Sequence, residues 1–424
     1  MLTKEKYQKY VHILKEELVP AMGCTEPIAI AFAGAKAKQV LGEMPVSATI
    51  EVSGNIIKNV KSVCVPKIGS LKGIDSALAA GIAVGDADAV LEVLSKVKES
   101  DVDKIKQLKQ NCKITVLKAN SPCVFEIAVT LQSQNHSSFV KITETHTNVV
   151  CIKKDGQVIY ENNTRIVERK ADRSFLNVKD IVEFANELNP DDVKQVLDRQ
   201  IQCNLAIAEE GLKNDYGANI GKVFLKAYPN DVKIRAKAYA AAGSDARMNG
   251  CDMPVIINSG SGNQGMTASL PVIVYAKHYQ KNSDILYRAL AVSNLITIHL
   301  KSGVGTLSAY CGVVSAGAGA GCGICYLMGG NFNDISHTLV NTLAIDSGVI
   351  CDGAKGSCAG KIAVAVECGI LGYEMYKMGN EFRSGDGIVK NGVEKTIASV
   401  SALAKFGMQK TDEEIIKIMT EDFE

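Results

Sequence analysis

The sequence predicts an α+β N-terminal domain with an antiparallel sheet, followed by an all-α C-terminal domain. Three observations predict this organisation. Segments rich in Val, Ile and Thr that alternate apolar and polar residues gather before residue 190. After Pro190 this strand signal fades and helical periodicity takes over. A length of 424 residues fits two domains, which we place at residues 1–190 and 191–424.

Two helices are expected at the start of the chain. Apolar residues recur at helical spacing through residues 4–18, and Pro20 follows the end of this segment. The turn AMGCTEP occupies residues 21–27. Its Pro27 suits the first turn of a second, Ala-rich helix over residues 28–40.

The rest of the N-terminal region is expected to hold a polar turn, a pair of helices and the strands. The segment SGNIIKN at 53–59 is interpreted as the turn, because Ser, Gly and Asn favour turns. Alanine repeats through two helices at 75–98. Alternation places the strands, the last four as an antiparallel run, at residues 46–52, 62–66, 113–117, 124–131, 139–145 and 149–153.

The C-terminal region shows helical periodicity in six segments, several of them apolar on all sides and therefore buried. They are DDVKQVLDRQIQCNLAIAEEGL, VKIRAKAYAAAGSDARM, SLPVIVYAKHY, ILYRALAVSNLITIHL, DISHTLVNTLAIDSG and KIAVAVECGILGYEMY. The final segment, TDEEIIKIMTEDFE, is expected to be an amphipathic surface helix.

Composition excludes some classes of partner. The chain is 46% hydrophobic and 22% charged, which is an ordinary globular balance, and its formal net charge is +1. It therefore lacks the basic footprint of a nucleic-acid-binding protein. The charged, amphipathic N-terminus does not have the pattern of a secretion signal, so we expect a cytoplasmic protein. In a reducing compartment the 13 cysteines are not expected to form disulfides.

One segment raises the question of a membrane. Residues 302–330 carry no charge and are long enough to span a bilayer. They consist largely of Gly and Ala, however, and no strongly basic flank marks an inside loop. We therefore expect a buried pair of helices in this segment and no membrane partner.

Three cysteines are candidate ligands of an iron–sulfur cluster. Cys351 and Cys358 bound the Gly-containing loop CDGAKGSC, which could wrap a cluster and donate backbone N–H groups to it. Cys311 precedes the Gly/Ala-rich segment and could return to the same point. Three thiolates on a four-iron cluster leave one iron open as a Lewis acid. The alternative is three buried structural thiols.

Two other cysteines, Cys322 and Cys325, form a lone CxxC. They lie inside a predicted buried helix and outside the βαβ context of thioredoxin-like redox motifs. We interpret them as packing residues.

Cys24, in AMGCTEP, is the candidate catalytic residue. A thiol at a helix N-terminus has a lowered pKa, so Cys24 could serve as a general base or as a fourth, displaceable ligand. Thr25 is a candidate substrate contact, although its hydroxyl could instead cap the helix.

Two polar turns suit a substrate carboxylate, because they combine Gly with Ser and Asn donors. They are SGN at 53–55 and SGSGNQG at 259–265, and they nominate Ser53, Asn55 and Asn263. The second turn also resembles a loop of pyridoxal-phosphate dehydratases. That alternative needs a Schiff-base lysine in an α/β fold, which the helical context here does not provide. His146, in ETHTNV, is a secondary candidate, since a lone His is more often structural.

Six segments together resemble the L-cysteine desulfidase family, which is related to the α-type iron–sulfur L-serine dehydratases. They are AMGCTEP, SGNIIKN, THTN, SGSGNQG, CGVVSAGAGAG and VICDGAKGSCAGK. The resemblance covers essentially the whole chain. It implies a lyase that converts L-cysteine to pyruvate, ammonia and sulfide with an oxygen-sensitive [4Fe-4S] cluster and no pyridoxal phosphate.

The resemblance also implies roles for the cysteines and the domains. Cys311, Cys351 and Cys358 would hold the cluster, and Cys24 would be the special fourth cysteine. The first domain would bind substrate and the second would carry the cluster. The chain departs from the serine dehydratases, which usually show Ser-Ser-His-Thr in their substrate-binding region and Cys-Asp-Pro at the second ligand. It has MGCTEP, and Cys-Asp-Gly at 351–353, which favours L-cysteine and leaves L-serine open. The other alternative is a non-catalytic iron–sulfur or redox-sensing protein, and we allow for a homo-oligomer.

Overall fold

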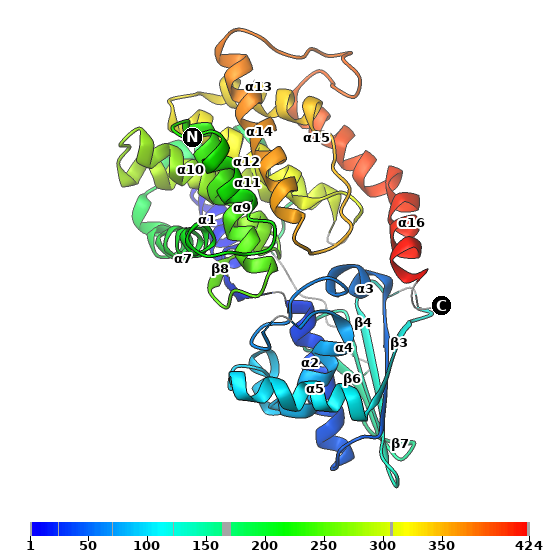
Figure 1. Ribbon diagram of the computed structural model, residues 1–424. Helices are drawn as coiled ribbons and strands as arrows, with labels where there is room; N and C mark the ends of the chain where they lie inside the picture. The colour runs from blue at the N-terminus through cyan, green and yellow to red at the C-terminus, as the bar shows by residue number, and fades with distance from the viewer. Residues whose placement is uncertain are drawn as a thin grey trace.

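A sheet-containing N-terminal region adjoins a helical C-terminal region in the computed structural model (Figure 1). The structure describes residues 2–23, 25–69, 71–121, 123–162, 171–305 and 308–421. We call the described residues between 25 and 162 the sheet lobe, and the helices before and after them the helical body. In Figure 1 the sheet lobe lies below the helical body, and α16 (Gln409–Thr420) runs down to it.

The sheet lobe contains a six-stranded sheet with the order β3-β2-β4-β5-β6-β7. Neighbouring strands from β4 to β7 are antiparallel, as predicted for β4, β5 and β6, whereas β7 was not predicted. Strand β2 is antiparallel to β4 but parallel to β3, so the expected wholly antiparallel sheet was wrong at this edge. The helices between β2 and β3 form the long crossover that a parallel pair requires. The strands are β2 Ser47–Val52, β3 Lys113–Lys118, β4 Glu126–Gln132, β5 Ser137–Thr143, β6 Val149–Lys154 and β7 Gln157–Glu161.

Helices cover one face of this sheet, and α2 packs directly on β4 and β5. Burial alternates along β5, as expected for a strand with one face in the core. The lobe helices are α2 Thr25–Leu41, α3 Gly54–Val60, α4 Gly73–Val84, η1 Ala87–Glu92, η2 Glu99–Asp101 and α5 Val102–Asn111.

Two further predictions in this lobe were wrong. The expected polar turn at 53–59 is largely the helix α3, because Ile56, Ile57 and Val60 are buried along it and tertiary packing outweighs the turn-forming residues. The expected strand at 62–66 is a loop that makes only an isolated bridge, from Cys64 to Lys72.

The core of the helical body includes the first helix of the chain. Tyr10, Ile13 and Leu14 of α1 are buried in the same cluster as Phe184 of α6. The chain therefore enters the helical body, leaves it for the sheet lobe and returns. The functional division at residue 190 stays a prediction. The helices are α1 Lys4–Glu17, α6 Val178–Glu187, η3 Pro190–Asp192, α7 Lys194–Lys213, α8 Ile220–Ala227, α9 Val232–Met248, α10 Gly262–His278, α11 Ser283–Val304, α12 Gly312–Leu327, α13 Phe332–Ile345, α14 Cys358–Lys377, α15 Val393–Ala402, η4 Leu403–Gly407 and α16.

One short strand interrupts the helical pattern. β8 (Pro254–Ile256) pairs antiparallel with β1 (Pro20–Met22), with Ala21 opposite Val255. This pairing ties the segment that enters the sheet lobe to the loop that precedes α10.

The uncharged segment at 302–330 contributes α12 to the centre of the helical body. α12 packs between α11 and α14 and is buried along its length. Small residues allow this approach, since a Cβ on Gly317 would lie 2.3 Å from the carbonyl oxygen of Ala365. Within the described residues, no helix combines the length and the apolar character needed to cross a membrane.

A buried carboxyl group near the end of α9 predicts a pH effect on stability. Asp245 is 0% exposed, and its Oδ2 accepts a hydrogen bond of 3.0 Å from the N–H of Gly221 at the start of α8. Burial raises the pKa of Asp245 to about 6, although backbone N–H groups oppose the shift. The folded protein therefore holds this proton more tightly than the unfolded chain does. The contribution of Asp245 to the free energy of unfolding is fully present below about pH 4, and it is lost as the pH rises to about 6.

Asp245→Asn is expected to remove this pH dependence. Above pH 6.5 the variant should be more stable than the parent by up to about 3 kcal/mol, the equivalent of the pKa shift. At pH 4 the two proteins should have nearly equal stability. Urea unfolding at both pH values measures this difference, and a stability difference that does not change with pH would contradict the prediction.

Candidate functional site

A short backbone bridge brings Cys311 and Cys351 together. Tyr310 and Ile350 pair as an isolated antiparallel bridge. On either side of it, Cys311 N–H donates to the carbonyl of Val349 at 2.9 Å and Cys351 N–H donates to that of Ala309 at 2.6 Å. Cys311 is also the N-cap residue of α12, so the bridge fixes the start of that helix.

The third cysteine of the predicted set, Cys358, is the first residue of α14. Its thiol lies 3.6 Å from the carbonyl oxygen of Gly353, inside the loop that begins at Cys351. Val63 of the sheet lobe and Met248 of α9 pack beside it. The structure therefore groups three cysteines at the beginnings of α12 and α14 and in the loop before α14.

The three thiols interact electrostatically. The adjacent Cys311 thiol is the largest cause that lowers the pKa of Cys351. The proximity of Cys351, followed by burial, raises the pKa of Cys311, and burial raises that of Cys358. The lowered pKa of Cys351 favours its thiolate form. A thiolate is the form of cysteine that binds metals.

A buried lysine from the sheet lobe also acts on Cys351. The side chain of Lys58, on α3, is 1% exposed, and its charge further lowers the pKa of Cys351. Gly353 fits against α3 only because it lacks a side chain. A Cβ there would lie 1.7 Å from the carbonyl oxygen of Lys58. The Lys58 ammonium pairs with Asp412 of α16 at 2.5 Å.

Removing Asp412 is expected to destabilise the fold. Asp412→Ala leaves the buried Lys58 without its carboxylate, which should cost about 3 kcal/mol in the free energy of unfolding. Glu413→Ala, at an exposed position on the same helix, is the matched control and should change stability by less than about 0.5 kcal/mol. Chemical denaturation measures both. Equal stabilities for the two variants would contradict a structural role for the Lys58–Asp412 pair.

Further lysines surround the cysteines. Lys355 and Lys361 both pair with Asp352, and Lys361 also donates to the carbonyl of Ile350 at 2.8 Å. Lys301, which is 8% exposed, donates to the carbonyl of Gly305. No described carboxylate pairs with Lys301. The lysines give the site a positive balance that suits a group of thiolates.

The arrangement does not resemble a site for a single ion. Within the described ranges, no three His, Cys, Asp or Glu side chains converge closely enough to hold one metal ion. In a [4Fe-4S] cluster each cysteine binds a different iron, so its ligands need not converge on one atom. The donor set of three thiols without a free carboxylate matches the chemistry of such a cluster.

Cys24 lies outside the described residues. Its neighbour Gly23 accepts a hydrogen bond at its carbonyl from Arg247 Nη2 at 3.0 Å. On the other side, α2 begins at Thr25, whose hydroxyl lies 3.3 Å from Glu26 Oε2. Glu26 Oε1 also accepts from Asn59 of α3 at 3.3 Å, so two of the predicted motifs meet here.

Asn263 lies in the first turn of α10 and is buried. Its Oδ1 is 3.4 Å from Arg247 Nη1, and its Nδ2 is 3.6 Å from the sulfur of Met248. Because Met248 packs on Cys358, Asn263 belongs to the neighbourhood of the three thiols.

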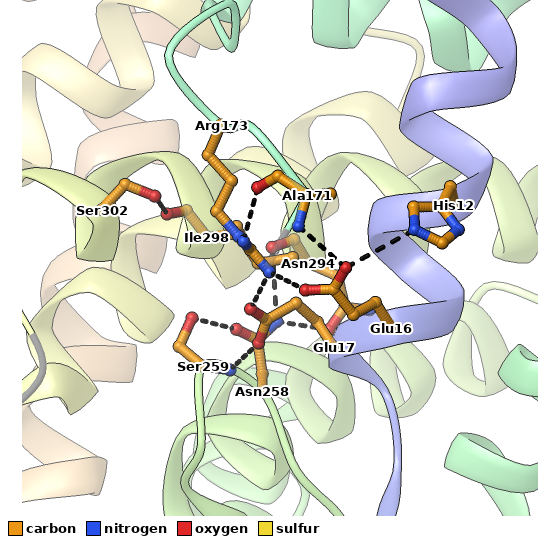
Figure 2. A network of polar contacts seen from close by, with 10 residues as sticks. All are labelled: His12, Glu16, Glu17, Ala171, Arg173, Asn258, Ser259, Asn294, Ile298 and Ser302. Carbon is orange, nitrogen blue, oxygen red and sulfur yellow. Dashed lines mark hydrogen bonds and ion pairs between the residues drawn. The ribbon is translucent and has the colours of Figure 1, made fainter. Parts of the chain in front are cut away.

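A buried polar network holds the turn before α10, as Figure 2 shows. Arg173 pairs with Glu17 of α1, and Glu17 accepts from the backbone N–H of Ser259 at 3.0 Å. The Ser259 hydroxyl donates to Asn258 Oδ1 at 2.9 Å, and Asn258 Nδ2 donates to Asn294 Oδ1 of α11 at 2.9 Å. These bonds hold the turn against α1 and α11.

The remaining candidate residues lie in the sheet lobe. Ser53 donates its hydroxyl to the carbonyl of Val124 at 2.9 Å, and the His146 ring packs on Phe125 with 4.8 Å between ring centroids. Asn55 Oδ1 is buried and accepts no hydrogen bond from the described residues.

Cys322 and Cys325 point away from this centre. The Cys322 thiol lies 3.8 Å from the carbonyl oxygen of Ile335 on α13. A Cβ on Gly330, beyond the C-terminal end of α12, would lie 2.4 Å from the Cys325 sulfur. Both thiols therefore lie toward the end of α12 opposite Cys311.

The fold and the site define an α+β protein in which a lysine-lined group of three thiols, two of them buried, lies between a sheet lobe and a helical body. The chain belongs to the serine dehydratase alpha chain family, whose model matches residues 88–417. This membership supports the wider group indicated by the motifs and indicates a serine dehydratase-like lyase.

Similar proteins align over nearly the whole chain. The UPF0597 protein DSY1109 of Desulfitobacterium hafniense is 56% identical over 97% of this chain and 96% of its own length. The UPF0597 protein of Lachnoclostridium phytofermentans is 53% identical over 97% of this chain and 99% of its own length. The UPF0597 protein of Treponema denticola is 45% identical over 99% of this chain and 100% of its own length. Their shared name specifies no substrate.

Proposed function

We propose that the chain is an iron–sulfur-dependent lyase that removes sulfide from L-cysteine by β-elimination. The observation that carries this proposal is the grouping of Cys311, Cys351 and Cys358 among buried lysines. We further propose that the protein works in a reducing compartment such as the cytoplasm, since the cluster type implied is oxygen-sensitive.

The residues present fit a [4Fe-4S] cluster. Cys311, Cys351 and Cys358 would hold it, and the pKa of Cys351 is lowered, chiefly by Cys311. The backbone N–H of Gly353 is directed at Cys351, which is the kind of donor that tunes cluster sulfurs. Asp352, the carboxylate nearest in sequence, is occupied by two lysines and does not compete.

When bound, the cluster supplies a Lewis-acidic iron that polarises the leaving group of the substrate. The chain binds and orients the amino acid through Thr25, Ser53, Asn55, His146 and Asn263. The unmet acceptor on Asn55 supports its role, since an ammonium group supplies the missing donor.

Cys24 is proposed as the base. Its thiolate takes the Cα proton, the C–S bond breaks, and the sulfur leaves as sulfide with the bonding electrons. The aminoacrylate that remains adds one water and releases ammonia, so that L-cysteine and water give pyruvate, ammonia and hydrogen sulfide. No oxidant or reductant is needed.

L-Serine dehydration is the second candidate, and the family description favours it. The Cys-Asp-Gly sequence at 351–353 favours L-cysteine. Anaerobic assays of iron-loaded protein with each amino acid distinguish them. We expect pyruvate and equimolar sulfide from L-cysteine at the higher kcat/KM. Faster pyruvate release from L-serine would reassign the substrate, and no turnover of either would overturn the proposed lyase.

A further inference from the structure

Arg247, near the end of α9, is a cation without an anionic partner among the described residues. Its guanidinium donates to two neutral oxygens, the carbonyl of Gly23 at 3.0 Å and Asn263 Oδ1 at 3.4 Å. Its Nε is buried and has no hydrogen-bond acceptor in the described part of the chain. A guanidinium has five N–H donors, so its capacity for an acceptor is largely unused.

The backbone at Gly262 leaves room for the Arg247 side chain. Gly262, directly before Asn263, lies against the guanidinium, and a Cβ there would be 2.5 Å from Arg247 Nε. Any other residue at position 262 would displace the arginine. The close approach fixes the planar fork against the turn that the sequence nominates for a carboxylate.

Arg247 also lies between the two parts of the proposed site. Through Gly23 it contacts the segment that leads to Cys24. Its neighbour Met248 packs on Cys358, one of the proposed cluster ligands. A ligand held by the guanidinium would therefore lie beside Gly23 and close to the proposed cluster ligand Cys358.

The chemistry of the ligand follows from the charge and geometry of Arg247. A partly buried guanidinium without a carboxylate partner is costly, and a bidentate carboxylate would satisfy it. We propose that Arg247 binds the α-carboxylate of the amino-acid substrate, with Asn263 held beside it. This assignment deepens the proposed function and rests on it.

Equilibrium binding of an unreactive pair of probes tests the assignment. L-Alanine carries the carboxylate but no leaving group, and L-alaninamide lacks the carboxylate. Iron-loaded parent protein, titrated under nitrogen, is expected to bind L-alanine at least tenfold more tightly than L-alaninamide. In Arg247→Gln, L-alanine affinity should fall about 10- to 100-fold, the range of a charged hydrogen bond, and the preference should vanish.

Two further variants serve as a second test and as a control. Arg247→Lys keeps the charge but loses the fork, so its affinity for L-alanine should also fall about tenfold. It serves as the test if Arg247→Gln does not fold. Arg235→Gln is the matched control on the same helix, where the guanidinium contacts His278 Nδ1 at 2.7 Å, and it should retain the preference.

An unchanged preference for L-alanine in folded Arg247→Gln or Arg247→Lys, or no preference in the parent, would overturn the assignment. A failure of the proposed lyase activity would be distinguished from a failure of this assignment. If the parent turns over neither L-cysteine nor L-serine, a carboxylate preference that disappears in Arg247→Gln still supports the binding site.

Discussion

Cys351→Ala is expected to abolish iron binding and turnover together. Anaerobically prepared parent protein should contain about four irons per chain, as the cluster type implies. Cys351 is the cysteine of the group whose pKa is lowered, by Cys311, Gly353 and Lys58, and its loss leaves only two of the three proposed ligands. Cys358→Ala should have the same effect, because it leaves two thiols. Iron and acid-labile sulfide analysis, run beside the anaerobic activity assay, measures both losses.

Cys325→Ala is the matched control for these two variants. Cys325 is also a buried cysteine, but it lies toward the opposite end of α12. The variant should retain iron and turnover, with only a modest loss of stability. Retention of about four irons by Cys351→Ala, or equal iron loss in Cys325→Ala, would remove the basis for the proposed ligand set.

Cys24→Ala is expected to lower turnover by at least 100-fold, the minimum usual contribution of a general base. If Cys24 acts as the base alone, the variant should retain its iron. Simultaneous loss of iron would instead identify Cys24 as a displaceable fourth ligand. Cys123→Ala removes an exposed cysteine and should leave kcat unchanged. Normal turnover in Cys24→Ala would show that Cys24 is neither the base nor an essential ligand.

Local sequence patterns predicted β2 to β6 and most helices, but they missed β1, β7 and β8. β4, β5 and β6 alternate in polarity, and periodicity marked helices such as α11 and α14. The parallel edge formed by β2 and β3 was not predictable, because alternation along a strand carries no information about its neighbour's direction. α3 was missed because Ser, Gly and Asn suggested a turn, whereas its burial depends on residues distant in sequence.

The sequence nominated Cys311, Cys351 and Cys358 together, and the structure places them near one another, but the residues around them were not predicted. Cys311 and Cys351 meet through a bridge between residues 40 positions apart, which no local pattern specifies. Lys58 lies within the SGNIIKN motif. A lysine between Ile57 and Asn59 was the one sign of a positive charge in this motif. Arg247 lies near the end of an alanine-rich helix, and only the fold reveals that no carboxylate in the described part of the chain pairs with it.

The most direct test of the proposed lyase is anaerobic turnover of L-cysteine as a function of bound iron. One preparation, divided into chelator-stripped and graded iron–sulfide-reconstituted portions, should release equimolar sulfide and pyruvate in proportion to iron, up to about four per chain. The stripped portion should be inactive with or without added pyridoxal phosphate. Turnover that persists in the stripped protein, or that returns with pyridoxal phosphate alone, would contradict the account.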